Sequence, residues 1–228
     1  MGTPMDSARL PPWTPPDPTR RLGVLISGRG SNMQALLDAI AAGRLDATPA
    51  VVVSNRADAP GLAIARDAGV ETLVVEHRGW KDRAAYDARL ADVLEEHGVS
   101  LVCLAGFMRI VGPALLQRFP QRVLNIHPSL LPAFPGLDAQ QQAFDHGVRI
   151  TGATVHVVDE GLDAGPIVAQ AAVPVLDDDT ANSLAARILV EEHRLYPVAV
   201  ARVLDGGWRI EGRRFVVRRD VEAAPAPR

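Results

Sequence analysis

The predicted fold of this 228-residue chain is decided by the stretch Arg122-Val-Leu-Asn-Ile-His-Pro-Ser-Leu-Leu-Pro132. Its first apolar residues predict a buried strand, and Pro128 ends that strand because proline has no backbone N–H to donate. Side chains alternate between the two faces of a strand, so Asn125 and His127 should point into the same space. In open α/β sheets, ligands bind just beyond the carboxyl ends of the strands.

The chemistry of this pair suits the attack of an amine on a carbonyl group. An amide N–H can stabilise a developing oxyanion, and an imidazole can move a proton near neutral pH. One Asn and one His at a strand end could equally form part of a turn. The prolines of Pro128-Ser-Leu-Leu-Pro132 stiffen the loop that follows, which favours a functional site.

Strand and helix patterns alternate on both sides of this stretch. Strands are expected at 22–27, 50–54, 71–75, 99–105, 150–158 and 167–175, and helices at 32–42, 58–69, 81–97, 113–119, 138–146 and 181–204. This order predicts an α/β fold with a doubly wound, mostly parallel, Rossmann-like sheet. No helix separates the strands at 150–158 and 167–175, so antiparallel strands are expected toward the C-terminal part. Thr180 should cap the last helix, which Pro197 interrupts, and a terminal hairpin follows.

Composition divides the chain into one domain and two ends. Residues 1–20 hold six prolines and predict a disordered arm, residues 21–218 a single domain, and residues 219–228 a tail. Hydrophobic residues make up 47% and charged residues 22%, which is ordinary for a globular protein.

Charge and cysteine usage exclude several classes of protein. A net charge of -3 argues against binding nucleic acid by neutralising phosphates. Cys103 is the only cysteine and lies in an apolar run, which predicts a core residue, no intrachain disulfide and a reducing cytoplasm. No apolar run reaches the ~18 residues of a membrane-spanning helix.

The stretch Ser27-Gly-Arg-Gly-Ser-Asn32 follows the first strand and predicts a phosphate site. Glycine lets backbone N–H groups approach a ligand, and a helix N-terminus, here capped by Ser31, favours an anion. A dinucleotide fingerprint would need a third glycine, and a Walker A loop would need Gly-Lys-Ser/Thr. A single phosphate therefore fits better than a pyrophosphate, although a turn without a ligand would explain the loop if it stood alone.

Three further segments could contribute to a site. Arg83 lies in the first turn of a helix, where the dipole disfavours a cation, so an anionic partner is possible beside the default of a solvated side chain. The apolar loop Gly106–Val111 could wall a pocket or simply pack in the core. The turn Asp159-Glu-Gly-Leu-Asp163 lacks EF-hand spacing and could be a solvated loop, or could supply a carboxylate that holds His127. The sequence itself does not choose among its acidic residues.

These motifs, taken together, resemble those of the folate-dependent formyltransferases, and among them the glycinamide ribonucleotide formyltransferase family. The resemblance covers about Leu22 to Gly206. The matching motifs are Ser27–Asn32, Leu104–Ile110, Asn125–Pro132, Leu162–Pro166 and Glu192–Pro197.

The resemblance implies a function and a set of site residues. The expected reaction moves the formyl group of 10-formyltetrahydrofolate to the amine of N1-(5-phospho-D-ribosyl)glycinamide in de novo purine biosynthesis, without a metal. The implied catalytic residues are Asn125, His127 and Asp163. The residues implied to bind the ribonucleotide are Gly30, Ser31 and Asn32 on the phosphate and Glu192 on the ribose. The residues implied to bind folate are Arg83, Met108, Arg109, Ile110, Val111, Asp159, Glu160, Gly161 and Leu162. Small-molecule partners and a monomer or homodimer are expected.

Two departures from the family pattern concern substrate contacts rather than the reaction class. Asp138-Ala-Gln140 stands where histidines are expected, and Leu189 stands where a polar residue often helps to bind the substrate.

Other formyl-folate enzymes share the Asn-x-His signature and are the nearest alternatives. A 10-formyltetrahydrofolate hydrolase would be expected to carry an N-terminal regulatory domain, which 20 proline-rich residues do not supply. A methionyl-tRNA formyltransferase would need a basic C-terminal domain. A non-catalytic nucleotide-binding protein would keep the glycine-rich loop but would have no need for the three catalytic residues together.

Overall fold

Short runs of buried apolar residues form the strands of this protein. The computed structural model describes residues 11–218; the first ten residues of the predicted arm and the tail predicted at 219–228 lie outside them. Within the described range, one nine-stranded sheet has the order β3-β2-β1-β4-β5-β6-β7-β9-β8. The strands are β1 (Arg21–Ile26), β2 (Thr48–Ser54), β3 (Thr72–Val74), β4 (Leu101–Leu104), β5 (Val123–His127), β6 (Ile150–Val157), β7 (Ile167–Pro174), β8 (Trp208–Glu211) and β9 (Arg214–Val217).

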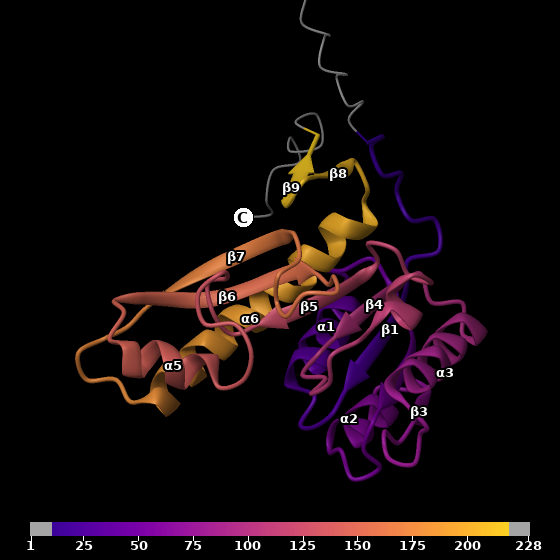
Figure 1. The fold of residues 1–228 in the computed structure, drawn as a ribbon, viewed down its shortest axis with the longest axis horizontal. Helices are drawn as coiled ribbons and strands as arrows, with labels where there is room; N and C mark the ends of the chain where they lie inside the picture. Colours follow the sequence, from indigo (N-terminus) through magenta and orange to yellow (C-terminus); the bar gives the residue numbers. More distant parts are fainter. Residues whose placement is uncertain (1–10, 219–228) are drawn as a thin grey trace, which may run out of the picture.

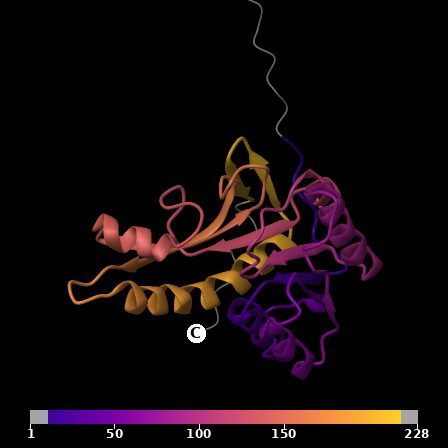
Figure 2. The ribbon, with the colours of Figure 1, turned by 60° about the horizontal axis from the view of Figure 1, so that its bottom comes forward.

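Helices cover both faces of the sheet, as the predicted doubly wound fold requires (Figures 1 and 2). Strands β1 to β5 are parallel. Val24 and Ile26 of β1 belong to the core under α1 and α6, whereas Leu25 between them belongs to the core under α3 and α4. The helices are α1 (Ser31–Ala41), α2 (Gly61–Asp67), α3 (Arg83–Glu96), α4 (Pro113–Leu116), α5 (Ala139–His146) and α6 (Ala181–Leu204).

The sheet becomes antiparallel one strand earlier than the sequence indicated. β6 and β7 are antiparallel, as predicted, but β5 and β6 are antiparallel too, although α5 lies between them in sequence. This helix contacts α6 at the end of the molecule far from β1 (Figure 1), so the chain does not cross back over the sheet before β6. The register aligns Asn125 with His156.

Three details of the helix ends differ from the predictions. Helix α2, expected at 58–69, begins only at Gly61, with Pro60 at its N-cap, and ends at Asp67. Ser31 is the first residue of α1 rather than its cap; Gly30 occupies the N-cap position, with no side-chain hydrogen bond. The short helix α4 ends at Leu116, before the predicted Phe119. Helix α6 matches its predicted bounds, is capped by Thr180, and continues through Pro197 instead of being interrupted there.

The described part of the proline-rich arm is packed against the C-terminal hairpin, in contrast to the disorder predicted for 1–20 (Figure 1). The backbone N–H of Thr14 donates to Trp208 O at 2.7 Å. The carbonyl oxygen of Thr14 accepts the backbone N–H of Gly207, also at 2.7 Å. A Cβ at Gly206 would lie 2.4 Å from the nearest backbone atom of the arm. Residues 11–20 can therefore pack against the turn after α6 because Gly206 in that turn has no side chain.

Asp17 fixes the arm to the rest of the molecule. This carboxylate is 5% exposed and accepts hydrogen bonds from the backbone N–H groups of Thr19 and Arg20. Its other oxygen lies 3.3 Å from the guanidinium of Arg122, the residue directly before β5. Burial acts to raise the pKa of Asp17, but the hydrogen bonds outweigh it and lower this pKa to about 2.

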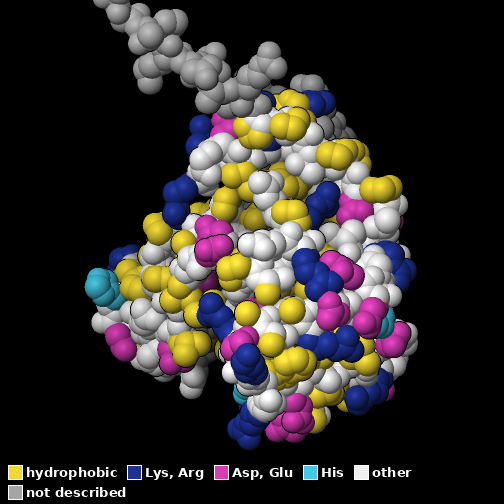
Figure 3. Space-filling model, turned by 45° about the vertical axis from the view of Figure 1, so that its right-hand side comes forward, with side chains coloured by type: hydrophobic (Ala, Val, Ile, Leu, Met, Phe, Trp, Pro, Cys, Tyr) yellow, Lys and Arg dark blue, Asp and Glu magenta, His cyan; other side chains and the backbone are white. Residues whose placement is uncertain are grey.

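Charges of both signs are interspersed over the face that carries α3 (Figure 3). Arg118 pairs with Asp92 and Glu95 of this helix, and Arg89 pairs with Glu96 at 3.2 Å. Ion pairs thus offset much of the charge on this face. No helix in residues 11–218 combines the length and apolar character that crossing a bilayer demands.

Candidate active site

The carboxyl end of β5 carries the predicted Asn-x-His pair. Asn125 and His127 face one side of the sheet, while Ile126 between them packs into the core under α1 and α6. His127 is 4% exposed. Its Nε2 lies 2.8 Å from Phe134 O and its Nδ1 lies 3.4 Å from Asp163 Oδ2. Because both ring nitrogens face oxygen atoms, the protonated ring can donate to both, and its orientation is fixed.

Asp163 reaches the pair from the loop that follows β6. Its φ is +47°, a left-handed conformation that non-glycine residues rarely adopt and that often marks a functional site. Its Oδ2 accepts the backbone N–H of Gly136 at 2.8 Å. Burial acts to raise the pKa of Asp163, but bonds from His156 and Gly136 and the charge of His127 hold this pKa below its usual value. Asp163 therefore stays ionised at neutral pH.

His156 completes the polar cluster of Asn125, His127, His156 and Asp163, and the sequence reasoning missed it. It is 2% exposed, and its Nε2 lies 3.2 Å from Asn125 Nδ2 and 3.6 Å from Asp163 Oδ1. Its Nδ1 lies 3.2 Å from Val157 O. His156 Nε2 thus lies between the amide of Asn125 and the carboxylate of Asp163. The alternation along β6 showed only that His156 and Val155 face opposite sides; its partner depends on the antiparallel register.

A buried polar network fixes the loop beyond β5. Thr154 Oγ1 donates to Ser129 O at 2.7 Å and accepts the Leu131 N–H at 3.1 Å. Gln170 donates from β7 to Leu131 O at 2.9 Å. The predicted rigidity of this loop therefore rests on neighbouring strands as well as on its prolines.

The glycine loop, defined as Gly28–Asn32, links β1 to α1. Gly30 has a φ of +76°, and a Cβ on it would lie 2.9 Å from the Cα of Gly61. The N–H of Gly61 donates to Gly28 O at 3.0 Å. The start of α2 thus packs directly on the glycine loop, and two glycines make this approach possible.

Asn32 and Glu192 face each other across this region. Asn32 Nδ2 donates to Glu192 Oε2 at 2.5 Å, while Asn32 Oδ1 is buried and lacks a partner in the part of the chain that the structure describes. Burial raises the pKa of Glu192, although the bond from Asn32 opposes this. An unpaired buried acceptor indicates a ligand that donates a hydrogen bond.

These residues line a cleft of about 700 Å³ at the carboxyl edge of the sheet. Arg29 and Arg56 bring positive charge to it, and Leu189 lines it from α6. The other lining residues are Ser27, Gly28, Gly30, Ser31, Asn32, Ala105, Gly106, Met108, Ile126, Pro128, Gln140, Asn182, Ala185, Ala186 and Glu192. The four residues implied to bind the ribonucleotide therefore share one cleft.

The β4–α4 segment, defined as Ala105–Gly112, holds four of the residues implied to bind folate. Met108 and Ile110 are 66% and 51% exposed, whereas Val111 is buried. Arg109 lies over the ring of Tyr86, with its Cζ 5.2 Å from the ring centroid. Arg83, which was predicted to lie in the first turn of its helix, is the first residue of α3 and approaches the end of this segment.

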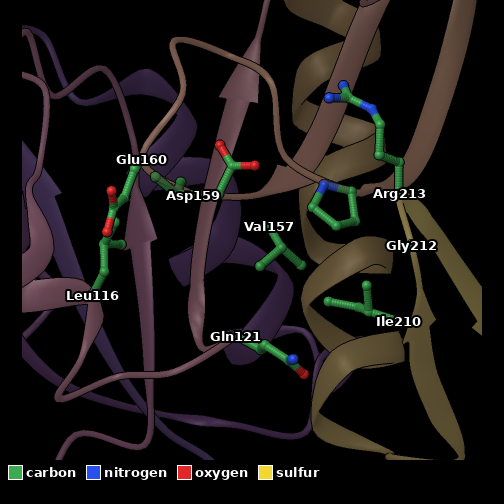
Figure 4. A pocket seen from close by; sticks show the side chains of 10 residues that line it. Leu116, Gln121, Val157, Asp159, Glu160, Ile210, Gly212 and Arg213 are labelled. Atoms are coloured by element: carbon green, nitrogen blue, oxygen red, sulfur yellow. The ribbon is translucent and has the colours of Figure 1, made fainter. Parts of the chain in front are cut away.

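The residues of the loop after β6 that are implied to bind folate lie in two different places. Leu162 is 55% exposed and lies near Gly136. Gly161 donates its N–H to Asp159 Oδ1 at 3.0 Å. Asp159 and Glu160 line a second cavity, of about 340 Å³, opposite the C-terminal hairpin (Figure 4). It is also lined by Leu116, Gln121, Val157, Val158, Pro166, Ile210, Gly212 and Arg213. These two acidic residues are therefore separate from the 700 Å³ cleft.

Comparison with known families identifies the group of proteins to which this site belongs. A family model described as "Formyl transferase" matches residues 20–200. The chain belongs to the formyl transferase family. Formyl transferases use a formyl-folate as co-substrate.

Individual formyl transferases resemble the chain over most of its length. The phosphoribosylglycinamide formyltransferase of Escherichia coli (strain K12) is 43% identical over 183 residues, which are 80% of this chain and 86% of that protein. The trifunctional purine biosynthetic protein adenosine-3 of Bos taurus is 46% identical over 190 residues, 83% of this chain. The chain covers only 19% of the length of that trifunctional relative.

A solved structure has the same fold as this formyl transferase. Glycinamide ribonucleotide transformylase 1 from Symbiobacterium toebii is 55% identical, with a TM-score of 0.86 over 87% of this chain and 94% of that one. The mostly parallel sheet with antiparallel strands near its C-terminal end is thus the fold of glycinamide ribonucleotide transformylases.

Proposed function

We propose that this chain transfers the formyl group of 10-formyltetrahydrofolate to the amine of N1-(5-phospho-D-ribosyl)glycinamide. The products are formylglycinamide ribonucleotide and tetrahydrofolate, in purine biosynthesis. The observation that carries the proposal is the convergence of Asn125, His127 and Asp163 at the carboxyl end of β5, where Ile126 and Pro128 line the same cleft as the glycine loop. Membership of the formyl transferase family, and the names of the E. coli relative and the S. toebii structure, support it.

The polar cluster can assist each part of this reaction. A new bond joins the substrate amine to the formyl carbon, the bond from that carbon to folate N10 breaks, and one proton passes from the amine to N10. We infer that the Asn125 N–H and the positive charge of protonated His127 stabilise the oxyanion. The proton moves through a water held by Asp163, or through His127 once one of its N–H groups leaves its oxygen partner. Such acid–base assistance contributes ~10²–10⁴-fold, and holding both substrates together accounts for much of the rest. The reaction as balanced needs neither a covalent enzyme intermediate nor a metal.

The ribonucleotide is assigned to the 700 Å³ cleft. Backbone N–H groups of Gly30 and Ser31 at the N-terminus of α1 suit its phosphate. A ribose hydroxyl that donates to Asn32 Oδ1 and another that bonds Glu192 would satisfy the polar groups there. Arg29 and Arg56 can offset the phosphate charge, since Leu189 supplies none.

The folate is assigned to the β4–α4 segment and the loop after β6. Met108 and Ile110 offer exposed apolar side chains to its flat ring, with Arg109 and Val111 beside them. Arg83 suits an anionic group of the folate. The remaining assigned residues are Asp159, Glu160, Gly161 and Leu162.

A two-substrate assay tests the proposal. The purified full chain is mixed with glycinamide ribonucleotide and a 10-formyl folate, and the deformylated folate is followed by absorbance. Release that requires the ribonucleotide is expected. Release without it would indicate a hydrolase, and no release despite bound folate would indicate a non-catalytic binding protein.

The His127→Ala variant tests the mechanism in the same assay. Its kcat is expected to fall by ~10²–10⁴-fold, because the proton carrier and its positive charge are both lost. The control is His97→Ala, which removes the same side chain at the C-cap of α3 and should leave kcat unchanged. Intact formyl transfer by His127→Ala would refute the role given to this ring.

A further inference from the structure

Asp87 is a buried carboxylate to which the proposed function gives no role. It lies on α3, one turn after Arg83, and is 2% exposed. Its Oδ2 accepts the backbone N–H of Gly112 at 2.7 Å. Gly112 ends the β4–α4 segment and is the N-cap of α4, which has no side-chain cap of its own. One hydrogen bond therefore fixes the end of this segment to a helix 25 residues away in sequence.

The backbone of the segment packs directly on this carboxylate. A Cβ at Gly112 would lie 2.9 Å from Asp87 Oδ2, closer than real Cβ contacts. It would lie 3.5 Å from Nε and Nη2 of Arg83. The φ of Gly112 is -114°, which any residue can adopt, so crowding rather than backbone strain demands glycine here.

Asp87 also lies within a group of charges. Burial raises its pKa, and the Gly112 N–H and the guanidinium groups of Arg83 and Arg109 act in the opposite direction. Arg109 Nε is buried and has no hydrogen-bond partner within residues 11–218. Arg83 and Arg109 together carry two positive charges beside the single carboxylate of Asp87, so a net positive charge remains for an anionic ligand.

A second oxygen holds the segment near its middle. Ser27 Oγ, at the end of β1, accepts the backbone N–H of Met108 at 2.8 Å. The backbone is thus fixed at two points, while the side chains of Met108 and Ile110 are 66% and 51% exposed. A fixed backbone that presents apolar side chains is typical of a preformed ligand site.

We propose that Asp87 is a positioning residue for folate binding: it holds the β4–α4 segment and the neighbouring Arg83 and Arg109 in the conformation that receives the co-substrate. This inference rests on the proposed function, which assigns that segment to the folate. Asp87 acts through Gly112 and the two arginines.

Steady-state kinetics of the full chain test this role. Asp87→Ala should raise the KM for 10-formyl folate about tenfold, because the Gly112 N–H loses its acceptor. Its kcat and its KM for the ribonucleotide should change by less than about twofold. Asp87→Asn keeps an oxygen that can accept the same N–H, so its folate KM should stay within about threefold of the wild-type value. The control, Asp92→Asn, removes the same charge from a half-exposed position on α3 and should leave the folate KM unchanged.

Three results would overturn the proposal. They are an equal rise of both KM values, a lower Tm with an unchanged folate KM, and an Asp87→Asn variant as impaired as Asp87→Ala. If Asp87→Ala does not fold, Gly112→Ala replaces it, since it crowds the retained carboxylate; an unchanged folate KM there would equally contradict the role.

The wild-type chain is measured first, so that the two proposals can fail separately. If it shows no ribonucleotide-dependent release, the proposed function fails. Equilibrium dialysis of 5-formyltetrahydrofolate against the same variants then tests Asp87 alone. Its role is supported if Asp87→Ala binds this folate more weakly than the wild-type chain while Asp87→Asn and Asp92→Asn do not. Equal binding by Asp87→Ala and the wild-type chain would refute it.

Discussion

Asp163 is the single residue that joins the two histidines of the polar cluster. Its carboxylate lies 3.4 Å from His127 and 3.6 Å from His156, on a backbone held in the left-handed region. A strained conformation of this kind costs on the order of 1–3 kcal/mol and persists only where neighbours enforce it. The bond from Gly136 to Asp163 is one such constraint.

Replacing this carboxylate should impair catalysis more than folding. Asp163→Asn keeps the shape but removes the charge that orients His127, so kcat should fall by ~10²–10⁴-fold. The Tm should fall only modestly, because the lowered pKa of Asp163 means that its charge also stabilises the fold. Steady-state kinetics and thermal unfolding check this, with Asp178→Asn on an exposed loop as the control. A variant with wild-type kcat would show that the carboxylate does not serve the reaction.

Local patterns predicted some members of this cluster and not others. Strand alternation alone brought Asn125 and His127 together, because both lie on one strand. The same alternation could not find His156, since its position opposite Asn125 depends on pairing between strands 31 residues apart. Asp163 followed from the family resemblance, because a left-handed residue in a loop has no periodic signal.

Among the elements, α2 has an unexpected influence on the glycine loop. The helix begins at Gly61, whose N–H bonds Gly28 O and whose Cα lies against Gly30. The bounds of most helices and strands follow from apolar periodicity to within two residues. A contact between two elements, such as that of α2 with the glycine loop, depends on how the layers pack. The sequence of neither element alone predicts it.

Adding one methyl group to α2 should therefore weaken ribonucleotide binding. A Cβ at Gly61 would lie 2.8 Å from Ile26 Cδ1 and 3.1 Å from the Cα of Gly30. Gly61→Ala should raise the KM for the ribonucleotide at least about tenfold by displacing the glycine loop, and leave the folate KM unchanged. Initial-rate kinetics check this against Ala63→Ser, an exposed change on the same helix. A rise in both KM values would instead indicate general unfolding.

At the scale of the whole molecule, the docked arm connects the beginning of the described chain to its end and to the strand that carries the site. Residues 11–20 bond to the segment after α6, and Asp17 pairs with Arg122 just before β5. Proline-rich composition predicted disorder here, because the docking depends on Gly206, almost 200 residues later. Composition alone carries no information about such a contact.

The pH dependence of stability should reveal this connection. The pKa of Asp17 is lowered from 3.8 to about 2 on folding, so its stabilisation is fully present above pH 3.8 and is lost as the pH falls through about 2. Asp17→Asn should lower the free energy of unfolding at pH 7 by about 2 kcal/mol, with a difference that shrinks in acid. Urea unfolding at several pH values checks this, with exposed Asp46→Asn as the control. A pH-independent difference would contradict the assigned cause.

The contact between Gly30 and Gly61 also restricts how this sequence can evolve. Each glycine excludes a side chain at the other, and Gly30 additionally has a φ of +76°. A Cβ on Gly30 would lie 2.9 Å from the Cα of Gly61, and a Cβ on Gly61 would lie 3.1 Å from the Cα of Gly30, so a second substitution within the pair cannot relieve the first. A lineage that lost this glycine pair would have to move the glycine loop away from α2, which makes the pair a barrier to neutral drift.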